Sequence, residues 1–172
     1  MNPPEQSTML RKPDSRFMLA HPAHWIAQGF GSGLAPALPG TFGTLFGWLV
    51  FVVLTARWPE FFTAANWAII IVVSFVVGIW ACDKTGRDLG IADHGSMVWD
   101  EIVAMWIVLL FIMPAGLATQ IWAFLWFRFF DMLKPPPIGW FDRRLKGGFG
   151  VMWDDVVAAF YTLLLFAVWR TL

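Results

Sequence analysis

The segment from Phe61 to Cys82 is uncharged and almost entirely apolar. A helix needs about 20 consecutive apolar residues to cross the hydrocarbon core of a bilayer. Inside that core every backbone amide and carbonyl must find its partner within the protein, which a helix achieves by itself. A segment of this length and character therefore predicts a membrane-spanning helix and argues against an ordinary soluble domain.

The composition of the whole chain agrees with a membrane protein. Charged residues make up 14% of the sequence, compared with about 25% in typical soluble domains. The 12 Trp and 17 Phe residues suit the aromatic belts that membrane proteins place at the lipid–water interface. The formal net charge of zero gives no reason to expect a nucleic-acid partner, and the single cysteine, Cys82, excludes an intramolecular disulfide.

Three further apolar segments extend this prediction to a bundle. They are Phe42–Ala56, Ile102–Phe127 and Val156–Trp169. Pro114 interrupts the longest of them, so we expect a hairpin of two helices at about residues 97–113 and 117–133. A re-entrant hairpin is the alternative, and it requires cover by surrounding protein. The expected fold is an all-α membrane protein, a compact bundle of about four to five transmembrane or partly re-entrant helices.

Basic residues gather on one side of this predicted bundle. With five crossings, the N-terminal arm and the loops at 83–97 and 134–151 lie on the same side. These segments carry Arg11, Lys12, Arg16, Lys84, Arg87, Lys134, Arg143, Arg144 and Lys146. The positive-inside rule makes that side cytoplasmic. We therefore expect a polar cytoplasmic arm at residues 1–21, a single membrane-embedded catalytic domain at residues 22–172, and a polar site on the cytoplasmic face.

Acidic residues occur at the same predicted helix ends. They are Asp100, Glu101, Asp131, Asp154 and Asp155. A favourable interaction with the helix dipole explains one acid in a first turn. It explains two adjacent acids poorly, because like charges repel. A divalent cation with oxygen ligands, Mg²⁺ or Mn²⁺, is the second interpretation, and it assigns metal binding to these carboxylates.

Candidate phosphate-binding residues follow from the segment Arg128–Lys134. Arg128 and Asp131 share a helix face, Lys134 continues it, and the prolines from Pro135 onward end the helix. Arg128 and Lys134 could neutralise phosphate oxygens. The alternative is an internal ion pair between Arg128 and Asp131, with Lys134 extending toward the membrane surface. Neither interpretation excludes the other from the sequence alone.

Two loops complete the candidate phosphate site. The glycine-rich stretch before Thr41 and Thr44 starts a helix from the polar side, and a helix N-terminus favours anions. Gly40, Gly43 and Gly47 also have the spacing of a close helix–helix contact. Asp142 and Arg143 belong to a basic, glycine-rich loop that either binds phosphate or is simply a solvated cytoplasmic loop.

Three motifs in order resemble the phosphatidylglycerophosphatase A family. They are GSGLAPALPGTFGT, ADHGSMVWDEIVAMW and FRFFDMLKPPPIGWFDRRLKGGFGVMWDDVVA, and the resemblance covers residues 22–162. It implies a magnesium-dependent, multi-pass enzyme of the bacterial inner membrane, which removes the terminal phosphate of phosphatidylglycerophosphate to give phosphatidylglycerol in phospholipid biosynthesis. The five acids would then hold Mg²⁺ and carry catalysis. Thr41, Thr44, Arg128, Lys134, Asp142 and Arg143 would bind the substrate phosphate.

An ion- or proton-coupled membrane transporter is the alternative function. Transporters place charged residues near the bilayer midplane, often at broken helices in paired repeats. Here the acids lie toward one face and no internal repeat is visible. The sequence therefore favours a lipid phosphatase whose partner is a phospholipid in the membrane, and it leaves the oligomeric state open.

Overall fold

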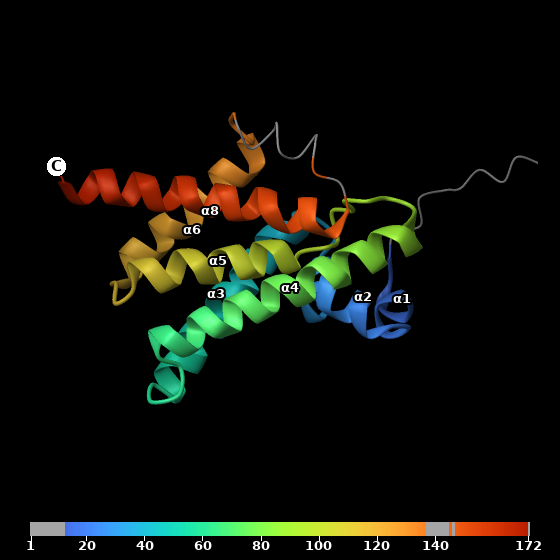
Figure 1. The fold of residues 1–172 in the computed structure, drawn as a ribbon, viewed down its shortest axis with the longest axis horizontal. Helices are drawn as coiled ribbons and strands as arrows, with labels where there is room; N and C mark the ends of the chain where they lie inside the picture. The colour runs from blue at the N-terminus through green and yellow to red at the C-terminus, as the bar shows by residue number, and fades with distance from the viewer. Residues whose placement is uncertain (1–12, 137–144, 146, 172) are drawn as a thin grey trace, which may run out of the picture.

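The regular secondary structure in the described part of the chain consists of helices alone. The computed structural model describes residues 13–136, 145 and 147–171, and no strand occurs among them (Figure 1). The elements are α1 (Ser15–Leu19), α2 (Pro22–Ala27), the 3₁₀-helix η1 (Gly29–Leu34), α3 (Pro39–Arg57), α4 (Ala64–Leu89), α5 (Trp99–Ile112), α6 (Leu117–Leu133) and α8 (Gly148–Thr171). The expected all-α fold is confirmed.

Among the described residues, three helices are long and apolar enough to cross a membrane. They are α3, α4 and the portion Gly148–Trp169 of α8. With 14 and 17 residues, α5 and α6 are about 21 and 26 Å long at 1.5 Å per residue. Both are shorter than the hydrocarbon core of about 30 Å. The lengths favour a partly re-entrant hairpin at α5–α6 over two complete crossings.

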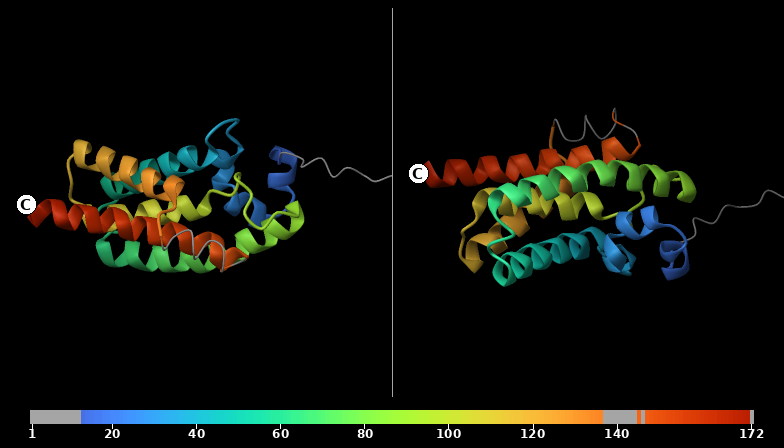
Figure 2. Two further views of the ribbon diagram at one scale, coloured as in Figure 1. Left: turned by 90° about the horizontal axis from the view of Figure 1, so that it is seen from above. Right: turned by 60° about the horizontal axis from the view of Figure 1, so that its bottom comes forward.

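Helix α5 has the protein cover that such a hairpin requires. It contacts α3, α4, α6 and α8, and 10 of its 14 residues are buried. In Figures 1 and 2 it lies in the middle of the bundle. A helix that is apolar on every face is stable in such a position, because no face meets water. The apolar sequence of α5 thus reflects burial among other helices as well as contact with lipid.

The α5–α6 turn sets which helix ends lie together. The chain turns between Ile112 and Leu117, around Pro114 as the sequence predicts. This turn and the α3–α4 connection lie at one end of the bundle, on the left in Figure 1. Because a hairpin returns the chain to its starting side, the start of α5 and the end of α6 both lie toward the other end, with the start of α8. The acidic helix ends are brought together by this topology.

A glycine face on α3 allows α5 to approach closely. A methyl group added to Gly43 would lie 2.6 Å from Val98 Cβ, and one added to Gly47 would lie 3.0 Å from the Ile102 Cα. Trp106 Nε1 donates a hydrogen bond of 2.8 Å to the carbonyl of Gly47. The predicted close helix–helix contact of these glycines is confirmed, and α5 is its partner.

The short N-terminal helices pack against the end of α4. His24 on α2 is buried, and its Nε2 lies 2.7 Å from Asp88 Oδ2 on α4. Its Nδ1 lies 3.0 Å from the carbonyl oxygen of Phe17 on α1. Lys84 also pairs with Asp88. This network fixes α1 and α2, and with them the chain that leads into η1 and α3.

Replacing Gly43 with alanine tests the α3–α5 contact. We expect Gly43→Ala to lower the free energy of unfolding by about 1–3 kcal/mol, because a backbone helix contact must move to admit the methyl group. Thermal unfolding of the purified protein in detergent measures the change. Gly95→Ala is the control, since no atom lies within 4 Å of the added methyl group. Equal unfolding midpoints for the two variants would contradict the proposed tight contact.

Candidate active site

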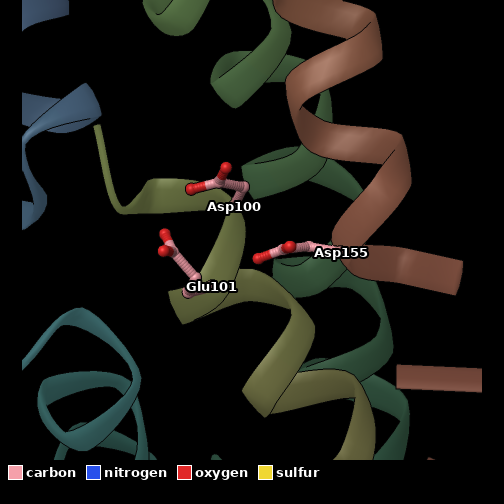
Figure 3. Close-up of side chains that lie close together, drawn as sticks. All are labelled: Asp100, Glu101 and Asp155. Carbon is pink, nitrogen blue, oxygen red and sulfur yellow. The ribbon is translucent and has the colours of Figure 1, made fainter. Parts of the chain in front are cut away.

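Three carboxylates form the centre of the polar site. Asp100 and Glu101 begin α5, and Asp155 lies near the start of α8. One oxygen from each side chain lies within 4.8 Å of the others. Figure 3 shows Asp155 reaching from its helix toward the two acids of α5. Asp100 and Asp155 are only 7% and 3% exposed. We call Asp100, Glu101 and Asp155 the acid cluster.

The acid cluster fits a divalent cation. Asp100 Oδ1, Glu101 Oε2 and Asp155 Oδ2 are buried and accept no hydrogen bond from the part of the chain that the structure describes. Burying carboxylate oxygens without a partner is costly, and the repulsion between neighbouring negative charges adds to that cost. Convergent carboxylate oxygens are the ligands that Mg²⁺ and Mn²⁺ prefer. The donor set therefore matches the metal that the sequence predicts.

Arg128 of α6 lies beside the acid cluster. Its Nη1 is 2.6 Å from Asp131 Oδ2 and 3.6 Å from Glu101 Oε1. It also donates to Thr44 Oγ1 at 3.4 Å. The side chains of Arg128, Asp131 and Glu101 are each 13% exposed. The internal pair of Arg128 with Asp131 is thus confirmed, while Arg128 Nε is a buried donor with no acceptor among the described residues.

The remaining two acids lie at the edge of the cluster. Asp131 interacts with both Glu101 and Asp155. Asp154 is buried, and its Oδ2 accepts a hydrogen bond of 2.6 Å from Lys134 Nζ. This contact joins the last turn of α6 to α8. Asp131 thus lies next to the positive charge of Arg128, and Asp154 next to that of Lys134. Metal binding by these two acids stays a prediction.

The N-terminus of α3 forms the opposite wall of the site. A methyl group added to Gly40 would lie 2.2 Å from Glu101 Oε1 and 3.0 Å from Arg128 Nη2. The first turn of α3 therefore lies beside the Arg128 guanidinium and the Glu101 carboxylate. A helix N-terminus next to an arginine favours an anion. Thr44 is fully buried and donates to the Gly40 carbonyl at 2.9 Å. Thr41 lies in the same turn and is half-buried.

The structure shows contacts within the protein for some of the residues that the sequence predicts to bind phosphate. The Thr44 hydroxyl contacts the guanidinium of Arg128, so it supports that side chain directly. Gly40 was expected to serve helix packing, and its contact with Glu101 could not be found from spacing because the two residues are far apart in the chain. Asp142 and Arg143 lie outside the described residues. Phosphate binding by these residues and by Thr41, Thr44, Arg128 and Lys134 stays a prediction.

The comparison with known proteins identifies the family. The sequence model of the phosphatidylglycerophosphatase A family matches residues 25–170. The phosphatidylglycerophosphatase A of Haemophilus influenzae is 43% identical over 88% of this chain and 91% of its own length. That of Escherichia coli K12 is 40% identical over 84% of this chain and 81% of its own length. No solved structure matches the chain.

A third relative carries a different name. A Bacteroides thetaiotaomicron protein, 40% identical over 84% of this chain and 91% of its own length, is named provisionally as a phosphatidylinositol-3-phosphatase. All three relatives are phosphatases that act on phosphorylated lipids according to their names. The chain belongs to the phosphatidylglycerophosphatase A family and is a phosphatase, a phosphoric monoester hydrolase.

Removing the Arg128 charge tests how the site is held together. We expect Arg128→Gln to lower the free energy of unfolding by about 3 kcal/mol, because Glu101 and Asp131 then lose a partly buried counter-charge. Arg57→Gln is the control, since Arg57 is exposed and stacks only over Trp58 among the described residues. Denaturation in detergent, followed by tryptophan fluorescence, measures both variants. A loss no larger than that of Arg57→Gln would contradict the account.

Proposed function

We propose that this chain hydrolyses the terminal phosphate of phosphatidylglycerophosphate to give phosphatidylglycerol, and that Mg²⁺ supports the reaction. The observation that carries the proposal is a cluster of convergent carboxylates beside an arginine. Asp100, Glu101 and Asp155 converge, and each has one buried oxygen with no hydrogen-bond partner among the described residues. Arg128 and the first turn of α3 lie directly next to Glu101. A phosphate bound to a divalent cation would fit this arrangement, because the carboxylates would bind the cation and Arg128 would bind the phosphate.

The acid cluster would hold the metal. Asp100, Glu101 and Asp155 supply oxygen ligands from two helices that are fixed by packing. When bound, Mg²⁺ would neutralise charge on the phosphoryl oxygens and activate a water molecule. Phosphoryl transfer depends mainly on position and on electrostatic stabilisation, since the charge is spread over the phosphoryl oxygens. Ligands on rigid helices suit that requirement.

The cationic side of the site would bind the phosphate. Arg128 offers its buried Nε–H, and the positive N-terminal end of α3 would add to the attraction for the phosphate. Asp131 and Thr44 hold the guanidinium in place. Lys134 would approach the phosphate from the end of α6, while Asp154 fixes its position. These groups would bind the substrate and also stabilise the negative charge of the transition state.

We place the enzyme in the bacterial inner membrane, with its site facing the cytoplasm. The named relatives are bacterial proteins. The loop that joins α4 to α5 follows Lys84 and Arg87 and leads directly into Asp100. More Lys and Arg residues lie on the side of the acid cluster than on the opposite side, which supports a cytoplasmic orientation of the acid cluster. A site at that depth would meet the phosphate of a lipid in the cytoplasmic leaflet.

Removal and return of metal test the proposed function. We expect the purified protein to release inorganic phosphate from phosphatidylglycerophosphate, to stop in excess EDTA, and to recover with Mg²⁺. Asp100→Asn and Asp155→Asn should lower turnover by about two orders of magnitude or more, since an amide keeps the shape but removes the ligand charge. Glu60→Gln, an exposed residue between α3 and α4, is the control.

Two results would contradict the proposal. Full turnover in EDTA after removal of bound metal would exclude the metal dependence. Preference for phosphatidylinositol 3-phosphate over phosphatidylglycerophosphate, measured as kcat/KM in the same mixed micelles, would exclude the proposed substrate.

A further inference from the structure

A groove lies between α6 and α8. Its residues include Pro114, Ala115 and Gly116 of the α5–α6 turn, which lies on the left in Figure 1. Its volume is about 590 Å³, and its lining is mostly apolar. The residues that matter here are Thr119, Trp122, Trp126, Leu165, Phe166 and Trp169. Because a lipid phosphatase must also accommodate the tails of its substrate, an apolar groove that shares α8 with the acid cluster and α6 with Arg128 has a direct candidate occupant.

Helix α8 connects the groove to the acid cluster. Leu165 and Phe166 follow Asp154 and Asp155 by 11 positions, which returns to nearly the same face of a helix after about 17 Å of rise. One leaflet of the hydrocarbon core is about 15 Å thick. A lipid whose phosphate lies at the acids would therefore reach the groove with the distal part of an acyl chain.

Helix α6 provides an apolar path over the same distance. Trp122, Leu125 and Phe129 are exposed and occupy one face of the helix. The ring of Trp126, which lines the groove, stacks against Phe130 with a centroid separation of 6.1 Å. Phe130 directly precedes Asp131. The surface thus stays apolar from the groove to the residue beside the charged site.

We propose that this groove seats one fatty acyl chain of the phospholipid whose phosphate is bound at the acid cluster. The inference rests on the proposed phosphatase function and adds the site for the tail. Its occupant must combine an anionic head with an apolar chain at this separation, as a phosphorylated diacyl lipid does. Since chain and bilayer are equally apolar, the groove acts by packing and orientation. A fixed chain positions the phosphate for reaction.

Filling the groove should separate long-chain from short-chain substrates. Thr119→Trp places a ring among the groove residues and changes no residue of the acid site. We expect it to lower kcat/KM about tenfold for a dipalmitoyl substrate, because the acyl chain no longer binds in the groove and no longer positions the phosphate. A dihexanoyl substrate, whose chains are too short to reach the groove, should change by less than about twofold.

Val73→Trp is the matched control. Val73 lies on the exposed face of α4 and is 55% accessible, so it adds the same ring to a surface that meets lipid. We expect this variant to leave both substrates unchanged. Equal losses on both substrates in Thr119→Trp would indicate a structural defect, and no loss on either would show that the chain does not use the groove. Either result overturns the inference.

Photo-crosslinking tests the occupant without turnover. A phosphonate analogue of the substrate that cannot be hydrolysed, with a diazirine at the end of one acyl chain, is irradiated with the full-length protein. We expect adducts on residues 119–126 and 165–169, and their loss in Thr119→Trp. Adducts spread equally over the exposed face of α4, or crosslinks that join two copies of the chain through the groove, would overturn the inference.

The two hypotheses fail separately in these experiments. Absence of phosphate release from both substrates by the wild-type protein would overturn the proposed phosphatase function. The crosslinking pattern still reports on the groove in that case. Phosphate release with no difference between Thr119→Trp and Val73→Trp would overturn the acyl-chain inference alone.

Discussion

The repulsion among three buried carboxylates is the constraint on which the rest of the structure depends. Asp100, Glu101 and Asp155 place an oxygen each within 4.8 Å of the others, and burial prevents water from screening them. Compensation comes from the surrounding helices. Arg128 lies next to Glu101, and the first turn of α3 lies beside both side chains. In the proposed function, a divalent cation would complete this balance and would act on the substrate phosphate.

The same helix contacts that build the bundle also build the site. Gly43 and Gly47 let α3 lie against α5, and Gly40 continues this contact to Glu101. A larger residue at Gly40 would push the helix N-terminus away from the acids. On the other side, the pair of Lys134 with Asp154 holds the end of α6 against α8. Packing and function are therefore not separable at this end of the molecule.

Local features were predictable from the sequence, and contacts between distant segments were not. Apolar length located α3, α4 and α8, and Pro114 located the turn between α5 and α6, because both act over neighbouring residues. The pair of Arg128 with Asp131 follows from helical spacing. The pair of Lys134 with Asp154 depends on how α6 and α8 pack against each other, which residue spacing does not predict. The burial of α5 could not be predicted either, because an apolar helix sequence is equally compatible with contact with lipid and with a protein core.

Locating a metal ion tests the central claim most directly. Crystals of the full-length protein grown with Mn²⁺, measured at an X-ray energy where manganese scatters anomalously, reveal the ion independently of activity. The account predicts a manganese peak about 2–2.5 Å from carboxylate oxygens of Asp100, Glu101 and Asp155. A peak at other acids, such as Asp83 at the end of α4, or no peak at a manganese concentration that supports turnover, would contradict it.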